Sequence, residues 1–121
     1  MLPHLNANPN TVTVSGFSAG CYMSHKLSII YSETIKGAGM FACWPYAGVY
    51  DGQDRRSVNK MANRAKRAIY REWHNDGECE EDEYCMIDDP ANIADQAIYI
   101  WGGTKDDVVA HKGQKAMKKL Y

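Results

Sequence analysis

A short β-branched run leads without a break into a glycine-flanked serine and then into a helical pattern, and this arrangement limits the fold most. Residues 11–15 (TVTVS) follow the turn residues Asn-Pro-Asn and predict a strand. Residues 16–20 (GFSAG) come next, and the spacing of apolar residues predicts a helix from about residue 19 to residue 31. Spacings of four and three place three side chains on its expected buried face: Met23, Leu27 and Ile30.

Strand-forming and helix-forming segments keep alternating along the rest of the chain. Residues 37–43 (GAGMFAC) are small and apolar and predict a second strand, buried on both sides. Residues 54–73 have the amphipathic period of a helix, residues 98–101 (IYIW) predict a third strand, and residues from about 112 to 121 predict another helix. This alternation predicts an α/β fold in which helices flank a parallel sheet.

Charge and hydropathy argue against two kinds of partner. The formal net charge is −1, so no strong field attracts nucleic acid or an anionic membrane. The basic side chains of residues 54–73 are followed at once by the acidic residues 78–83, with no interleaved aromatic platform, so no nucleic-acid site is predicted. No apolar run approaches the ~20 residues of a membrane-spanning helix. The first ten residues also lack the pattern of a signal peptide.

Four cysteines favour an oxidising compartment with one or two disulfides. Cys79 and Cys85 flank an acidic segment and could close a small loop, whereas Cys21 and Cys43 lie in apolar surroundings and could be buried thiols. The sequence leaves the pairing open. No pair has the short spacing of metal-ligand cysteines, so no metal is predicted. No glycine loop suited to phosphate is present, so no cofactor is predicted either.

The segment Gly16-Phe17-Ser18-Ala19-Gly20 is a G-x-S-x-G motif at a strand-to-helix turn. Such a turn is so sharp that bulky residues two before and two after the serine would collide, and glycines at 16 and 20 remove this obstacle. The hydroxyl of Ser18 is then expected to project from the carboxyl edge of the sheet as a nucleophile, with the Ala19 N–H as an oxyanion donor. The alternative is a tight turn whose serine only caps the helix.

A nucleophilic serine needs a histidine to take its proton and a carboxylate to orient that histidine. Two aspartates, Asp106 and Asp107, follow the predicted strand at residues 98–101, and both qualify on spacing. The alternative interpretation is an ordinary aspartate-rich turn that caps the next helix. The sequence therefore predicts a carboxylate at a strand end but does not choose between the two.

None of the four histidines fits the role of general base well. His25 is seven residues beyond the serine on the same helix, roughly 10 Å along the axis and away from the strand end. His4 precedes the first strand, His74 closes the long helix, and His111 would reach the serine only if its loop folded back. We therefore expect the base to lie on a segment beyond the last residue of this sequence.

These motifs also carry a resemblance to a known family, the polyhydroxybutyrate depolymerase-like esterases. The resemblance extends over most of the chain, through residues 2–3, 5–7, 12–20, 22–23, 31–32, 35–39, 42, 45–46, 87–92, 99–106 and 108–109. It implies a secreted or vacuolar carboxylic-ester hydrolase that acts on short hydroxyacyl polyesters or related esters. It also implies a circularly permuted α/β-hydrolase fold, whose nucleophile strand comes near the N-terminus.

By the motif match, Ser18 takes the role of nucleophile, and Asp106 rather than Asp107 takes the role of acid. The resemblance implies that residues 1–121 form a single partial α/β-hydrolase domain, with the histidine, further strands and one oxyanion donor past its end. One departure concerns Cys43-Trp44, which stands where the family usually has Gly-Gly before Pro-Tyr. This departure leaves open both the disulfide that the family has at this point and the shape of the nearby wall.

Two hypotheses about function follow. The first is a serine carboxylic-ester hydrolase in which a histidine from outside this sequence shuttles the proton. The second is a non-catalytic, truncated paralogue that serves as a structural or assembly subunit. A three-stranded parallel sheet leaves an edge and a face unprotected, so we also expect a protein partner to complete the sheet.

Overall fold

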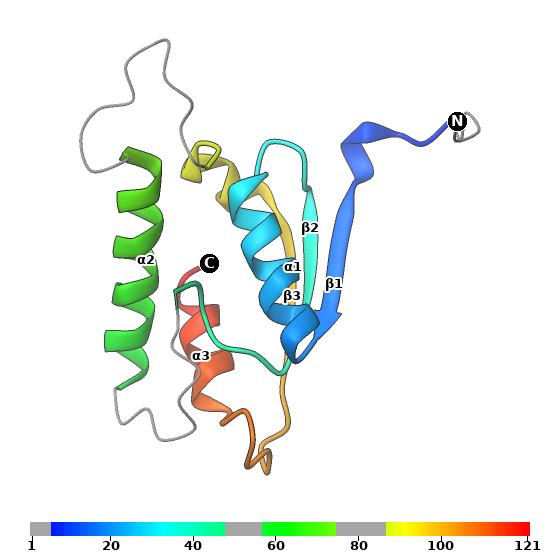
Figure 1. Ribbon diagram of the computed structural model, residues 1–121. Helices are drawn as coiled ribbons and strands as arrows, with labels where there is room; N and C mark the ends of the chain where they lie inside the picture. Colours follow the sequence, from blue (N-terminus) through cyan, green and yellow to red (C-terminus); the bar gives the residue numbers. More distant parts are fainter. Residues whose placement is uncertain (1–5, 48–56, 75–86) are drawn as a thin grey trace.

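The computed structural model describes residues 6–47, 57–74 and 87–121. Three strands alternate with three α-helices, and two short 3₁₀ helices precede the first and the last strand (Figure 1). The elements in chain order are η1 (Pro9–Thr11), β1 (Thr13–Phe17), α1 (Ala19–Ile30), β2 (Gly37–Phe41), α2 (Val58–His74), η2 (Pro90–Asp95), β3 (Ala97–Trp101) and α3 (Lys112–Lys118). The predicted order of strands and helices is confirmed.

The three strands form one parallel sheet in the order β1-β2-β3. Their last residues pair across the sheet, because Phe17 is in register with Phe41 and Phe41 with Trp101. All three strands therefore end at one level, and the segments that follow them leave from the same edge of the sheet (Figure 1). The predicted α/β class, with a parallel sheet flanked by helices, is confirmed.

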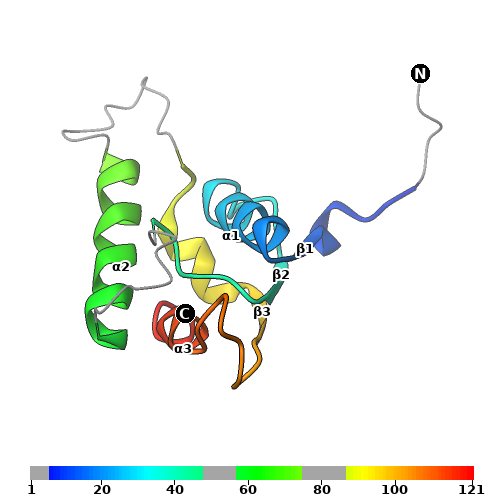
Figure 2. The ribbon, with the colours of Figure 1, turned by 60° about the horizontal axis from the view of Figure 1, so that its bottom comes forward.

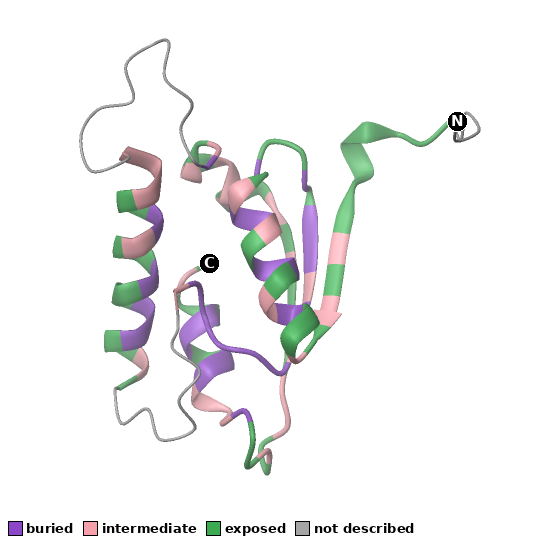
Figure 3. Ribbon diagram, viewed as in Figure 1, coloured by how far each residue is buried: buried purple, intermediate pink, exposed green. Residues whose placement is uncertain are grey.

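The helices cover one face of the sheet and leave the other bare within the described residues. Side chains that point toward the helices, such as Val14, Met40 and Ile100, join a core with Met117 of α3. The helix α2 packs against α3 on the outside of this layer (Figure 2). The alternate side chains of the edge strands are exposed, and Figure 3 shows this pattern along β1. The second predicted strand, β2, is therefore only in part buried on its bare face.

The buried face of α1 differs from the predicted one. Met23 has 58% of its surface exposed, and the side chains that are buried instead are Cys21, Ser24, His25, Ser28 and Ile29. The prediction from the spacing of apolar residues was wrong, because small polar residues of a helix can be buried when their hydroxyls form hydrogen bonds to the backbone. Ser28 shows this, since its Oγ donates to the carbonyl of His25 at 2.9 Å.

The prediction for the long helix is confirmed from Val58 onward, and residues 54–56 lie outside the described residues. Met61, Ala65 and Ile69 are buried on one face of α2, as the amphipathic period of this helix requires. Ile69 and Ala65 pack with Ile29 of α1, so α2 buries the outer side of α1. Within the described residues, no helix has both the length and the apolar character needed to cross a membrane.

Cys21 and Cys43 are joined in a disulfide, which corrects their interpretation as free buried thiols. Their Cα atoms are 5.8 Å apart, within the usual range for a disulfide. The sequence does not reveal this pairing, because the two cysteines are 22 positions apart and only the parallel pairing of β1 with β2 brings the start of α1 beside the end of β2. Cys79 and Cys85 lie outside the described residues.

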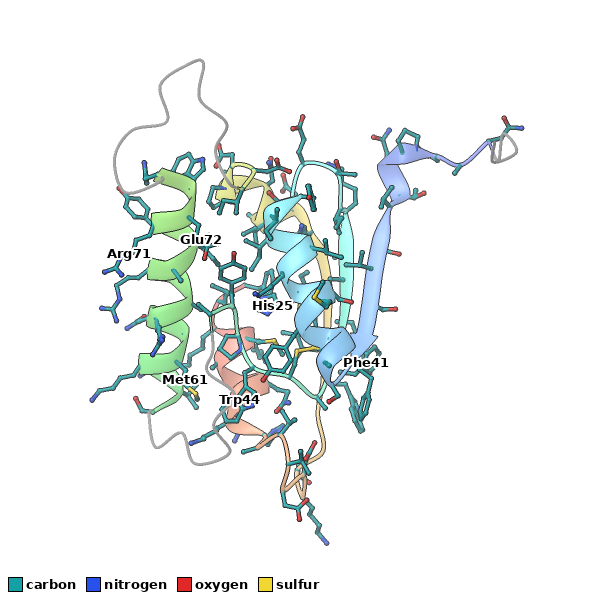
Figure 4. The ribbon with its side chains drawn as sticks, viewed as in Figure 1. His25, Phe41, Trp44, Met61, Arg71 and Glu72 are labelled. Atoms are coloured by element: carbon teal, nitrogen blue, oxygen red, sulfur yellow. A yellow bond between two sulfur atoms is a disulfide. The ribbon has the colours of Figure 1, made fainter. Side chains whose placement is uncertain are left out.

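His25 is buried between α1 and α2, as Figure 4 shows, with 1% of its surface exposed. Its ring lies edge-on to Tyr46, with centroids 6.2 Å apart, and its Nε2 has no hydrogen-bond partner within the described residues. Burial lowers the pKa of His25 to about 4, and a hydrogen bond with the Trp44 backbone offsets part of this effect. The imidazole is therefore neutral in the fold at pH 7.

We expect acid to destabilise the protein through His25. Because the folded pKa of about 4 lies below the ordinary histidine pKa of 6.5, the unfolded chain binds the proton more readily. The free energy of unfolding should be at its full value above pH 6.5 and fall by about 3 kcal/mol as the pH drops to 4. Urea unfolding at pH 7.5 and pH 4.5 should show this loss, and His25→Phe should reduce it. If His25→Phe keeps the pH dependence of the wild type and of a His74→Phe control, the assignment is wrong.

Candidate active site

Ser18 stands between the last residue of β1 and the first residue of α1, in a backbone conformation that few residues adopt. Its φ is 53° and its ψ is −120°. A positive φ at a non-glycine residue costs on the order of 1–3 kcal/mol and persists only where the surroundings enforce it. The Ser18 N–H donates to the carbonyl of Phe41 at 3.0 Å, which fixes the turn to the end of β2.

The side chain of Ser18 is not used to cap the helix. It forms no capping hydrogen bond to α1, and the residue is partly exposed. The alternative interpretation of a serine that caps the helix through its side chain therefore has no support in the geometry. The hydroxyl remains available to a group that approaches the carboxyl edge of the sheet.

The two glycines of the motif differ in their steric role. A Cβ added at Gly16 would lie 2.2 Å from the carbonyl oxygen of Gly20, a distance that the backbone cannot tolerate. A Cβ added at Gly20 would meet nothing within 4 Å. The expected steric need is thus found at Gly16, whereas the expectation for Gly20 is wrong. The collision is between position 16 and the backbone of position 20, so only the first glycine relieves it.

Ala19 is the first residue of α1 and is exposed. The first N–H groups of an α-helix have no intrahelical acceptor, and the helix dipole adds a partial positive charge at this end. The backbone N–H of Ala19 therefore belongs to a group of donors beside Ser18 that suits a developing negative charge.

Asp106 lies in the loop that follows β3, and its carboxylate is held in place by the backbone. Its Oδ1 accepts hydrogen bonds from the N–H of Val108 at 3.0 Å and from the N–H of Val109 at 2.8 Å. Its Oδ2 accepts no hydrogen bond within the described part of the chain. Asp107 is exposed, whereas Asp106 is partly buried. Of the two aspartates, Asp106 is therefore the one with a fixed carboxylate.

Ser18 and the Asp106 loop follow β1 and β3 at the same edge of the sheet, with β2 between them (Figure 1). Adjacent strands are about 4.8 Å apart, so about 10 Å separates the two strand ends. The structure thus brings the predicted nucleophile and acid to one edge, with the end of β2 between them.

None of the three described histidines lies between these two residues. His25 is buried in the core, and His74 lies at the far end of α2, where its ring is tilted against the ring of Tyr70, with centroids 4.1 Å apart. His111 is the N-cap residue of α3 and lines a groove of about 630 Å³ beside β3. His4 lies outside the described residues. A second cavity, of about 490 Å³, lies between α2, η2 and Leu120, and neither cavity is lined by the predicted nucleophile or acid.

No group of three or more His, Cys, Asp or Glu side chains within residues 6–47, 57–74 and 87–121 could hold a metal ion.

No protein-family model matches this chain. Among curated proteins, it is 31% identical over 125 residues to a polyhydroxybutyrate depolymerase of Talaromyces funiculosus, a match that covers 98% of this chain and 32% of the relative. It is 29% identical over 127 residues to a poly(3-hydroxybutyrate) depolymerase of Delftia acidovorans, which covers 99% of this chain and 24% of the relative. The chain thus spans about a quarter to a third of the length of these relatives.

Solved structures give the same result. The crystal structure of a PHB depolymerase from Penicillium funiculosum matches with a TM-score of 0.70 and 28% identity, over 98% of this chain and 36% of that structure. A serine-to-alanine variant of a PHB depolymerase, complexed with an R3HB trimer, matches with a TM-score of 0.67 and 27% identity over the same shares. Sequence and structure therefore confirm the resemblance of nearly this whole chain to the polyhydroxybutyrate depolymerases, which are α/β-hydrolases.

Proposed function

We propose that this chain carries the nucleophile and the acid of a serine carboxylic-ester hydrolase that acts on short hydroxyacyl polyesters or related esters. The observation that carries the proposal is the backbone of Ser18, which has a positive φ at a turn that only glycine at position 16 permits. Strained backbone of this kind at a non-glycine residue is concentrated at active sites and ligand-binding sites. The polyester substrate is supported by the relatives, one of which is complexed with an R3HB trimer.

In the proposed mechanism, the Ser18 hydroxyl attacks the ester carbonyl and gives its proton to a histidine. The N–H of Ala19 donates to the oxygen that becomes negative in the tetrahedral intermediate. Collapse of this intermediate expels the alcohol, which takes the proton from the histidine, and water then releases the acyl group by the same steps. The carboxylate of Asp106 orients the histidine through Oδ2, while Oδ1 stays bonded to the loop backbone.

We place the general base, a histidine, on residues other than those that the structure describes. A place for added polypeptide exists beside β3, where a groove of about 630 Å³ is lined by Ile98, Tyr99, Ile100, Trp101, Gly102, His111, Gln114, Lys115 and Lys118. Five of these residues are consecutive and follow the outer edge of the sheet. A free edge presents unpaired N–H and C=O groups that another strand can pair with. We propose that a further strand completes the sheet here.

The proposed location is an oxidising compartment, either outside the cell or in a vacuole. The disulfide between Cys21 and Cys43 supports this, because disulfides persist mainly in such compartments.

A non-catalytic packing module is the second candidate. It is favoured by the lack of a described histidine between Ser18 and Asp106, and by the lack of a described cavity at either residue. In that case the turn at Ser18 would be an inherited feature of the fold.

Hydrolysis of an R3HB trimer distinguishes the two candidates. We expect the purified protein, together with the polypeptide that supplies its general base, to release 3-hydroxybutyrate, measured by chromatography, and Ser18→Ala to lower the rate by on the order of 10⁴-fold or more. Ser15→Ala is the matched control, because Ser15 lies on β1 three residues earlier and is exposed. A folded wild type that hydrolyses the trimer no faster than buffer would favour the packing module.

A further inference from the structure

A disulfide joins the two segments that hold Ser18 in place. Cys21 lies in the first turn of α1, three residues after Ser18, and Cys43 lies two residues after Phe41, the last residue of β2. Both cysteines are fully buried, with 0% of their surface exposed. Figure 4 shows the bond between the two sulfur atoms close to α1 and the lower end of the sheet. The crosslink is therefore adjacent to the turn that carries the hydroxyl.

The conformation of Ser18 needs restraint, because an L residue rarely adopts a positive φ of 53°. Two backbone hydrogen bonds supply part of it. The Ser18 N–H donates to the carbonyl of Phe41 at 3.0 Å, and the N–H of Tyr22 donates to the carbonyl of Ser18 at 3.2 Å. The disulfide links the same two segments, residues 18–22 and residues 41–43, a few residues beyond the first of these bonds.

The segment that carries Cys43 also contacts the side of the sheet that carries the acid. The N–H of Ala42 donates at 2.9 Å to the carbonyl of Trp101, the last residue of β3. The Sγ of Cys43 lies 3.9 Å from the Sδ of Met117 on α3, the helix after the acid loop. Residues 41–43 thus lie between the nucleophile turn and the strand that precedes the acid loop.

We propose that the Cys21–Cys43 disulfide is a positioning element, which holds the Ser18 turn against the ends of β2 and β3. Without it, the backbone hydrogen bonds alone would hold the turn, and Ser18 would leave its strained conformation more often. The effect of the disulfide on catalysis rests on the proposed function. The restraint of the turn does not, because it can be measured without any activity.

Amide hydrogen exchange of the double variant Cys21→Ala/Cys43→Ala tests the restraint. We expect the amides of Ser18 and Tyr22 to exchange at least tenfold faster than in the wild type. The control is Ile69→Ala, which removes a buried side chain in the core between α1 and α2, away from the turn. In the control, these two amides should change no more than the other amides of α1. An unchanged exchange in the double variant, or an equal change in the control, would overturn the proposal.

If the double variant does not fold, the wild type can be titrated with a phosphine reductant instead. The amides of Ser18 and Tyr22 should then lose protection before the far-ultraviolet circular dichroism changes, and simultaneous loss would contradict the proposed restraint.

The catalytic consequence is measured by the rate at which a fluorophosphonate labels Ser18. We expect this rate to fall at least tenfold in the double variant and to stay within twofold of the wild type in Ile69→Ala. Faster exchange with an unchanged labelling rate would restrict the disulfide to a structural role and refute its catalytic one. A wild type that is not labelled would count against the proposed function, while hydrogen exchange would still decide whether the turn is restrained.

Discussion

Replacing Gly16 with alanine is expected to abolish hydrolysis and to destabilise the fold by about 3 kcal/mol. The added Cβ would lie 2.2 Å from the carbonyl oxygen and 2.3 Å from the carbonyl carbon of Gly20. Both atoms belong to the backbone, so no side-chain rotation can relieve the clash. The turn must open, and the Ser18 hydroxyl then loses its position at the edge of the sheet.

Gly20→Ala is the matched control within the same motif. Its Cβ would meet nothing within 4 Å, so we expect a free energy of unfolding within about 1 kcal/mol of the wild type. Urea unfolding and hydrolysis of the R3HB trimer measure both effects for both variants. Equal behaviour of the two alanine variants would show that the packing of the turn does not determine the position of the serine.

Asp106→Asn is expected to lower the turnover number by on the order of 10⁴-fold, with a much smaller change in the stability of the fold. An asparagine can keep a carbonyl oxygen as acceptor for the N–H groups of Val108 and Val109, which Oδ1 of Asp106 now binds at 3.0 and 2.8 Å. The loop should therefore keep its shape. The second position becomes an amide donor, which cannot accept the histidine N–H and so cannot orient the proposed base.

Asp107→Asn provides the control, because Asp107 is the exposed neighbour in the same loop. We expect its turnover number to stay within about twofold of the wild type. Steady-state kinetics on the R3HB trimer, with circular dichroism to confirm folding, measures both variants. A larger loss with Asp107→Asn than with Asp106→Asn would transfer the role of acid to the neighbouring residue.

The order of strands and helices could be predicted from the sequence because each element has its own period of apolar residues. The boundaries depend on pairing partners that are distant in the sequence. The first strand was expected to end before Gly16, yet β1 continues to Phe17, since Gly16 pairs with Met40. A strand that lies in a parallel sheet ends where its neighbour stops pairing, and the local sequence does not contain this information.

The buried face of α1 shows a second limit. Met23, Leu27 and Ile30 have the right spacing, but the helix buries Ser28 and His25 instead. The choice of face depends on where α2 and the segment after β2 pack. Those contacts are long-range, so the spacing of apolar residues along α1 cannot determine them.

The candidate site, like the fold, could be predicted from the sequence only in part. The positions of Ser18 and Asp106 at one edge of the sheet could be predicted, because a G-x-S-x-G turn and a strand-end aspartate are local features. The pairing of Cys21 with Cys43 could not, since the fold alone brings them together. The motif also predicts a steric need for glycine at position 20, which the structure does not show. The sequence cannot tell which of the two glycines would bring its Cβ into contact with the backbone.

Covalent labelling by a fluorophosphonate tests directly whether Ser18 is an activated nucleophile. The reagent reacts with serine hydroxyls whose proton can be removed, and peptide mapping identifies the residue that carries the label. We predict that the wild type is labelled at Ser18, that Ser18→Ala removes the label, and that Ser15→Ala retains it. A folded wild type that stays unlabelled, or that carries the label at another serine, would contradict the assignment of this turn as the catalytic one.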